Sequence, residues 1–294
     1  MITIKRGKLD TPIKTVIYGD PGVGKTTFAA NAPNPVFLDL EGSTQNQDVA
    51  RIYLDEKPLT TFDEVRAVLS GVSTSEPITL VIDTFDALEA MAQRHLCDQF
   101  GKKSIEDFGF GKGYAQTAEL CRGVLGQLDA LIHKGVGVVI VAHSKIATFN
   151  NPEGDNWDRY ELKLHKKTGE ALVEWADNVL FAHRESYAVE SNGKAKAAGT
   201  YARYLHAVGS PAYVAKNRYN LPDKFALDWP TYENGCKRGA ESVESLYAIA
   251  LAEVEGLPED RKEKALGALE PIKTDATKLN RFIDYCKSTK GTQK

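Results

Sequence analysis

Residues 19–26 read Gly-Asp-Pro-Gly-Val-Gly-Lys-Thr, a glycine-rich loop of the form G-x-x-x-x-G-K-[ST]. In such a loop the glycines let backbone N–H groups turn inward around phosphate oxygens. The lysine reaches the outer phosphates, and the hydroxyl that follows it is a hard oxygen ligand suited to Mg²⁺. An apolar run precedes the loop and helix-forming residues follow it, which is the context that the motif requires. The sequence therefore predicts a site for ATP or a similar nucleotide with Mg²⁺.

The residues expected to bind the nucleotide are Gly19, Asp20, Pro21, Gly22, Val23, Gly24, Lys25, Thr26 and Thr27. Lys25 is also expected to stabilise charge that develops on the phosphates during reaction, and Thr26 to ligate the metal. A glycine-rich turn that binds nothing is the alternative interpretation.

Two carboxylates follow apolar runs that have the character of buried strands. Asp83 ends the run at residues 77–83 and is typical of the acid that holds Mg²⁺ or its bound water, although such an acid can also merely cap the next helix. Because Thr84 rather than a glutamate follows Asp83, the base that activates water must come from elsewhere. Glu41 is the candidate, provided that its strand lies beside that of Asp83.

A third candidate is His143, which follows the uncharged run at residues 136–142. A neutral histidine can donate one hydrogen bond. The alternative is a histidine at the end of a strand that makes its hydrogen bonds only to nearby protein groups.

Apolar runs and helical periodicity alternate over the first half of the chain, which is typical of a parallel sheet covered by helices. Strands are predicted at residues 13–18, 35–40, 77–83 and 136–142, and helices at 26–31, 61–69, 87–100 and 114–133, with Thr61 as a helix cap. Residues 144–167 follow no period and are interpreted as a long loop. Later strands are expected at 176–183, 198–208 and 212–215, the first two joined by a turn at Asn192 and Gly193, and helices at 241–252 and 275–288.

The chain has 294 residues, enough for one α/β core, predicted at residues 1–235, and a small C-terminal helical appendage, predicted at 236–294. A net charge of −3 gives no overall attraction for polyanions, and the four widely spaced cysteines fit neither a zinc site nor a disulfide framework. Because no apolar run is long enough to cross a bilayer, we expect a cytoplasmic protein without a membrane partner.

Four stretches resemble segments of the RecA superfamily and occur in the same order. Residues 19–26 resemble its phosphate loop, and residues 37–41 resemble the strand that carries its catalytic glutamate. Residues 80–84 resemble the segment with its metal-binding acid, and residues 139–144 resemble its γ-phosphate sensor strand. A fifth stretch, residues 213–222, resembles the K-N-[KR] strand by which RecA-like and DnaB-like subunits insert cations into a neighbour's ATP site. The resemblance implies that His143, which stands where RecA commonly has a glutamine, senses the γ-phosphate. It also implies that Lys216 and Arg218 act catalytically in trans, so that ATP sites are completed between subunits. Two solvated edge-strand cations are the alternative.

The layout of residues 10–230 is most similar to short phage ATPases with a RecA core, the Sak-type proteins of single-strand annealing and recombination. The resemblance implies an α/β fold with a RecA-like P-loop core, a mainly parallel sheet flanked by helices, and late antiparallel strands. It implies ATP hydrolysis with Mg²⁺, assembly into a ring or filament of identical subunits, and action on single-stranded DNA. A phage-encoded protein in the host cytoplasm, with a single-strand-binding protein as an optional partner, would fit this class.

In RecA-like proteins the loops after the metal-acid helix and after the sensor strand face DNA, which corresponds by position to residues 101–113 and 145–167. Lysines there could contact phosphates and aromatic rings could stack on bases. The candidate contacts are Lys102, Lys103, Lys112, Phe149, Trp157, Lys163, Lys166 and Lys167. Since acids balance bases in the second loop, a lid that packs its aromatics on the core is the alternative.

Residues 191–222 carry lysines, arginines and tyrosines but no acid, which indicates either a phosphate-tracking face or ordinary strand structure. Two other functions also share the predicted core. One is a ring-type helicase or translocase motor. The other is a KaiC-like ATPase switch that regulates a protein partner without binding DNA.

Overall fold

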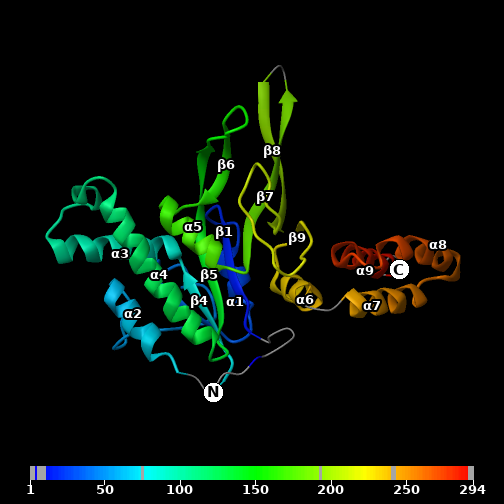
Figure 1. Ribbon diagram of the computed structural model, residues 1–294, viewed down its shortest axis with the longest axis horizontal. Helices are drawn as coiled ribbons and strands as arrows, with labels where there is room; N and C mark the ends of the chain where they lie inside the picture. Colours follow the sequence, from blue (N-terminus) through cyan, green and yellow to red (C-terminus); the bar gives the residue numbers. More distant parts are fainter. Residues whose placement is uncertain (1–3, 5–10, 74–75, 192–193, 240–242, 291–294) are drawn as a thin grey trace.

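The computed structural model describes residue 4 and residues 11–73, 76–191, 194–239 and 243–290 of the chain. Within them, nine strands form one sheet in the order β3-β2-β4-β5-β1-β7-β8-β9, and β6 pairs with the outer part of β5 (Figure 1). The strands are β1 Lys14–Gly19, β2 Pro35–Asp39, β3 Ala50–Arg51, β4 Thr79–Asp83, β5 Gly137–Phe149, β6 Trp157–Leu162, β7 Asn178–Ser191, β8 Lys194–His206 and β9 Lys224–Ala226. The helices are α1 Lys25–Ala30, α2 Phe62–Gly71, α3 Phe85–Phe100, α4 Lys112–Ile132, α5 Lys166–Trp175, α6 Trp229–Gly239, α7 Val243–Glu255, α8 Glu259–Leu269 and α9 Ala276–Lys290, with short 3₁₀ helices η1 Ile105–Phe108 and η2 Glu270–Ile272.

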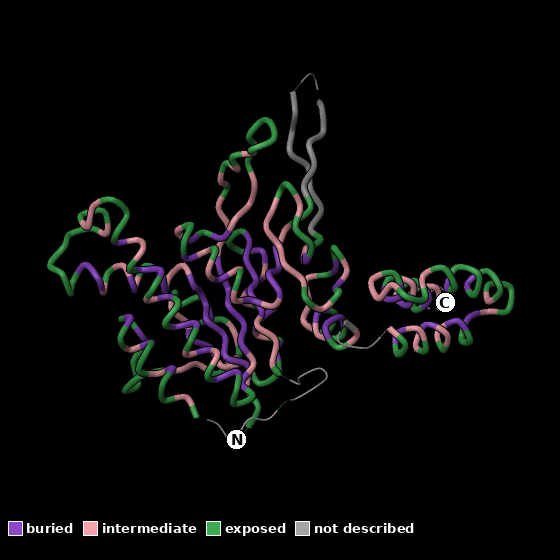
Figure 2. Tube along the Cα trace, viewed as in Figure 1, coloured by how far each residue is buried: buried purple, intermediate pink, exposed green. Residues whose placement is uncertain are grey.

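The centre of the sheet is parallel. β4 lies between β2 and β5, and β1 lies between β5 and β7. Every residue of β4 is buried, as expected for a parallel strand covered on both faces, and Figure 2 shows buried residues concentrated in these central strands. The predicted α/β fold with a mainly parallel sheet, late antiparallel strands and C-terminal helices is confirmed.

Helices cover both faces of this sheet. On one face, α2 to α5 pack against alternate strand residues such as Tyr18 and Phe181. On the other face, α1 and α6 cover residues such as Ile17, through Phe28 and Tyr232. As predicted, Thr61 caps α2: it accepts from the Glu64 N–H, and the Glu64 side chain accepts in return from the Thr61 N–H.

The predicted loop at residues 144–167 is wrong. β5 continues to Phe149 and forms an antiparallel hairpin with β6, and α5 starts at Lys166. The hairpin extends beyond the sheet core, and most of its side chains are only partly buried there. Its sequence therefore lacks the alternation of apolar and polar residues by which a half-buried strand is recognised. Cross-strand pairs stabilise it instead, including the rings of Phe149 and Trp157, whose centroids lie 4.9 Å apart.

The late antiparallel strands occur as predicted, as the pair β7 and β8. The turn predicted at Asn192 and Gly193 lies outside the described residues. The strand predicted at residues 212–215 is instead a series of isolated bridges, in which Tyr213 pairs with Tyr160 of β6 and, just after it, Lys216 pairs with Val179 of β7.

The C-terminal helices α7, α8 and α9 share a hydrophobic cluster of their own, which includes Leu246, Leu279 and Ile283. They lie to one side of the sheet beyond α6, and an ion pair of 2.6 Å between Arg238 and Asp284 joins α6 to α9 (Figure 1). Cys236, in α6, is buried against the sheet. A domain boundary between residues 235 and 236 stays a prediction.

The four cysteines are buried and free of disulfides. None of the helices in the described part of the chain combines the length and the apolar character needed to cross a membrane.

Replacing Leu246 by alanine should loosen α7 to α9 without disturbing the sheet, because Leu246 is fully buried in the separate cluster. A loss of about 2–5 kcal/mol is expected for a buried leucine. Hydrogen exchange should accelerate in peptides from α7 to α9 and stay unchanged in peptides from β4 and β5. Leu266→Ala, at a half-exposed position of α8, is the matched control. Equal acceleration in β4 and β5 would show that the helices and the sheet unfold as one unit.

Candidate nucleotide site

The carboxyl ends of the parallel strands bring the candidate residues to one edge of the sheet. Gly19 at the end of β1 is in register with His143 of β5, and Asp39 at the end of β2 is in register with Asp83 at the end of β4. A cavity of about 290 Å³ opens at this edge. It is lined by Pro21, Gly22, Gly24, Lys25, Thr26, Thr27, Glu41, Ser43, Asp83, Thr84, His143 and Arg203.

Lys25 lies buried at the base of the phosphate loop. Its Nζ donates to the carbonyl oxygens of Gly19 and Asp20, each at 2.9 Å. Burial lowers the pKa of Lys25, while the carboxylates of Asp83, Asp86, Asp20 and Glu41 oppose that shift. The ammonium group is therefore placed among carboxylates and loop carbonyls, within reach of an anion that the loop would hold.

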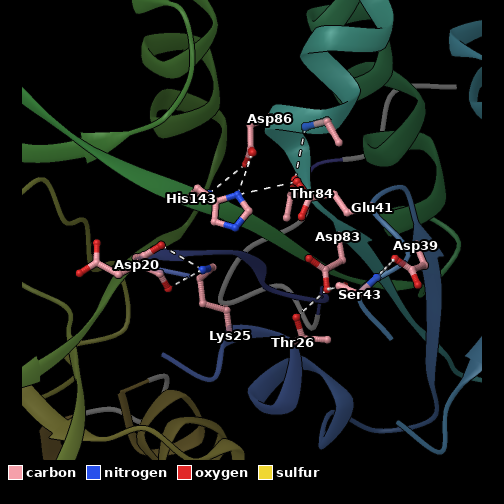
Figure 3. Close-up of polar contacts among 12 residues, drawn as sticks. Asp20, Lys25, Thr26, Asp39, Glu41, Ser43, Asp83, Thr84, Asp86 and His143 are labelled. Atoms are coloured by element: carbon pink, nitrogen blue, oxygen red, sulfur yellow. Dashed lines mark hydrogen bonds and ion pairs between the residues drawn. The ribbon is translucent and has the colours of Figure 1, made fainter. Parts of the chain in front are cut away.

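The residues at the end of β4 fit a Mg²⁺ ion. The Thr26 hydroxyl donates to Asp83 Oδ2 at 2.7 Å, and the Ser43 hydroxyl donates to the same oxygen at 3.0 Å (Figure 3). Burial raises the pKa of Asp83, and these two hydrogen bonds oppose the shift. A carboxylate and two hydroxyls are hard oxygen donors of the kind that Mg²⁺ prefers.

Ser43 was not predicted, and Asp39 explains its position. Asp39 accepts from the N–H groups of Ser43 and Thr44, each at 3.0 Å, and from the Thr44 hydroxyl at 2.5 Å. Burial raises the pKa of Asp39, but the hydrogen bonds outweigh it and the pKa lies below its ordinary value. Asp39 thus folds the segment after β2 so that Ser43 faces Asp83. An aspartate at the end of a strand with Gly-Ser-Thr starting three residues later, at residues 42–44, is the signal that could have identified this turn.

Glu41 lies where sequence reasoning required it. β2 is paired with β4, and Glu41 Oε1 accepts from the Thr84 hydroxyl at 2.7 Å (Figure 3). Thr84 directly follows Asp83 and also caps α3, accepting from the Ala87 N–H. The strand beside β4 therefore supplies a carboxylate next to the position where other nucleotide hydrolases carry their glutamate.

Asp86 orients His143. Its two carboxylate oxygens accept from the His143 backbone N–H at 2.9 Å and pair with His143 Nδ1 at 2.8 Å. Asp86 therefore engages Nδ1 and leaves Nε2 as the ring nitrogen that can face a ligand. The expected role of His143 as a sensor of the γ-phosphate stays a prediction.

Glu41, Asp86 and His143 also form a compact group, with one ligand atom from each lying within 4.8 Å of the others. The Asp86 and Thr84 hydrogen bonds already satisfy its members. We therefore interpret the group as the candidate base Glu41 beside the hydrogen-bonded pair of Asp86 and His143, and not as a metal site.

Lys216 and Arg218 do not line the cavity of their own chain. Lys216 Nζ donates to the carbonyl oxygens of Val173 and Glu174 at the end of α5, each at 2.8 Å, and Arg218 pairs with Asp177 at 2.9 Å. These partners lie near the amino end of β7, whereas the phosphate loop follows the carboxyl end of β1, its parallel neighbour. A role in a neighbour's site stays a prediction.

Two arginines that sequence reasoning did not connect with this site do contact the phosphate loop. Arg184 of β7 donates to the Gly22 carbonyl at 2.9 Å, and Arg203 of β8 donates to the Val23 carbonyl at 3.4 Å. Arg203 stood out only as one cation of the acid-free stretch, and no local motif marks Arg184.

The candidate nucleic-acid residues fall into two groups. Exposed lysines lie in the connection between α3 and α4 beside Phe110, whose side chain is fully exposed, and others lie around the start of α5. These lysines are Lys102, Lys103, Lys112, Lys163, Lys166 and Lys167. Phe149 and Trp157 pack on each other, and the Trp157 N–H donates to the Pro211 carbonyl at 2.8 Å. The two rings therefore stabilise the hairpin, and contact of any of these residues with nucleic acid stays a prediction.

The site combines a phosphate loop, a hydroxyl and an acid that fit a metal ion, and a glutamate beside them, all at one edge of a parallel sheet. This combination defines a P-loop nucleotide hydrolase. Residues 11–219 match the AAA domain family, and since this is more than half of the chain, the protein belongs to that family. A curated relative is the SPbeta prophage-derived uncharacterized protein YorG of Bacillus subtilis (strain 168), 22% identical over 231 residues, which are 78% of this chain and 66% of the relative. The chain thus spans slightly less than two thirds of that relative.

The Asp86 contact predicts that His143 contributes to ATP hydrolysis. Because Asp86 engages Nδ1, the ring presents Nε2 as its free nitrogen, and His143→Ala should lower kcat by roughly 10²–10³, the usual cost of removing one group that stabilises charge in a transition state. His133→Ala, at an exposed position after α4, is the control and should leave kcat unchanged. A wild-type kcat in His143→Ala would contradict this role.

Proposed function

We propose that this protein is a Mg²⁺-dependent ATPase whose turnover is coupled to single-stranded DNA, and that it acts as a homo-oligomer in phage recombination or strand annealing. The observation that carries the catalytic part is the convergence of Lys25, Thr26, Asp83 and Glu41 on one cavity. The prophage origin stated in the name of the curated relative supports the phage context.

The chemistry follows from the positions of the side chains. The phosphate loop and Lys25 hold the phosphates. Glu41, oriented by Thr84, accepts a proton from a water molecule as that water attacks the γ-phosphorus, and the bond from phosphorus to the β-bridging oxygen breaks to release ADP. His143 stabilises charge on the γ-phosphate oxygens. Mg²⁺ at Thr26 and Asp83 would supply charge neutralisation on the phosphates.

The DNA part rests on the connection between α3 and α4. Phe110 is a fully exposed aromatic ring in this connection, with exposed Lys102 and Lys103 in the same connection and exposed Lys112 at the start of α4. Aromatic rings beside cations are a common platform for single strands. Completion of ATP sites by Lys216 and Arg218 of a neighbouring subunit rests on the likeness to RecA-like proteins.

Lys25→Ala should abolish ATP binding measured by calorimetry, because it removes the cation that holds the outer phosphates. Glu41→Gln should bind ATP with nearly the wild-type Kd while kcat falls by roughly 10²–10⁴, the usual range for a general base. Glu119→Gln, on the exposed face of α4, is the matched control and should hydrolyse ATP normally. Wild-type turnover by Glu41→Gln would rule out Glu41 as the base.

A poly-dT oligonucleotide should bind with an affinity that falls steeply as salt rises, and it should raise the ATPase rate. Phe110→Ala should weaken binding by about 1–3 kcal/mol, the value of one stacked base, and Phe149→Ala should not. Absence of salt-sensitive binding would favour an ATPase switch that acts on a protein partner. Strand displacement on forked DNA would favour a translocating motor.

A further inference from the structure

Arg184 and Arg203 form a pair of cations beside the phosphate loop. They are directly opposite each other in the ladder of β7 and β8, so their side chains leave the same face of the sheet. Like charges directly opposite on a sheet destabilise it unless something compensates them. No ion pair links either arginine to a carboxylate among the described residues. Such an uncompensated pair points to an anion as its partner.

The register of the sheet explains why both arginines reach the loop. β7 runs parallel to β1, with Ala182 opposite Gly19, so Arg184 lies just beyond the point where β1 passes into the phosphate loop. The strand is irregular directly after Arg184, and such bulges redirect side chains near active sites.

The two arginines contact the phosphate loop but use few of their N–H donors to do so. Each guanidinium gives one hydrogen bond to a loop carbonyl, at Gly22 or at Val23, and a guanidinium carries five N–H donors. Arg203 also lies directly over Gly24, since a Cβ added there would come within 2.7 Å of its Nη1. It lines the same cavity as Lys25, Thr26 and Glu41. Both side chains are exposed and can therefore turn toward a ligand.

We propose that Arg184 and Arg203 are ligands, within the same subunit, for the polyphosphate chain of the nucleotide that the loop binds. Guanidinium groups bind phosphate oxygens with short, charge-assisted and often bidentate hydrogen bonds. On binding, the two side chains exchange carbonyl partners for phosphate oxygens, and the unfavourable proximity of their charges is relieved. This proposal rests on the proposed nucleotide binding.

The first test measures binding of ATP with Mg²⁺ by calorimetry. Arg184→Ala and Arg203→Ala should each raise Kd roughly 10–100-fold, and Arg203→Lys should show a smaller rise. Arg122→Ala, which removes an exposed arginine from α4, is the matched control and should leave Kd unchanged. If the wild type binds ATP but both β7–β8 variants bind it within about twofold of the wild type, the arginine proposal is wrong and the nucleotide function stands. If the wild type binds no ATP, both fail.

A second test asks whether Arg203 acts in its own subunit. In mixtures of Arg203→Ala and Lys25→Ala subunits that co-assemble, no subunit carries a complete site, so ATPase activity should stay at the sum of the two separate variants. Recovery of activity would place Arg203 in a neighbour's site and overturn the proposal. The same mixture made with Arg218→Ala in place of Arg203→Ala should recover activity if Arg218 acts in trans, which makes it the internal contrast.

Discussion

The parallel pairing of β4 with β2 on one side and β5 on the other determines the positions of Glu41, Asp83 and His143. Parallel strands end at the same edge of a sheet, and the in-register pairs of Asp39 with Asp83 and of Gly19 with His143 fix how far each strand extends toward the phosphate loop. A shift of one residue would turn each strand's side chains to the other face. The site therefore depends on backbone pairing before it depends on any side chain, and burial of β4 on both faces stabilises that pairing.

The same constraint explains how one carboxylate can be supplied from different strands. Thr84 occupies the position after the metal-binding acid, and its hydroxyl bonds the carboxylate of Glu41 from the adjacent strand. The distance between two paired strands, roughly 4.8 Å, is small enough for a side chain from either one to serve the same point in space. The position of the candidate base is thus defined by its place in the sheet, whereas its place in the sequence can differ.

The chemistry of the loop, Asp83 and the capping residue Thr61 could be predicted because each depends on neighbours close in sequence. Glu41 could be predicted only conditionally, since its role required β2 to lie beside β4. Asp86, Arg184 and Arg203 could not, because each acquires its role through a strand or helix distant in the chain. The turn that carries Ser43 leaves a local signal, but the contact of Ser43 with Asp83 depends on the pairing of β2 with β4. The hairpin of β5 and β6 was missed for a related reason: it is stabilised by pairing between its two strands, and its partly buried faces leave no apolar period to detect.

The charge balance of the site explains why phosphate binding would need more than the loop. Asp20, Glu41, Asp83 and Asp86 all act on buried Lys25, so a polyphosphate would enter a group already rich in carboxylates. Two unit charges 4 Å apart interact by about 4 kcal/mol at the effective dielectric constant typical near a protein surface. Positive charge must therefore come from outside this group. A divalent cation fits the Thr26 and Asp83 side, and Arg184 and Arg203 lie on the side of β7 and β8. Because β1 lies between β5 and β7, the loop that follows it can hold an anion between these two sources of charge. Under the arginine proposal, β7 and β8 supply one of these two sources of charge, so the outer strands of the sheet belong to the nucleotide site together with the central ones.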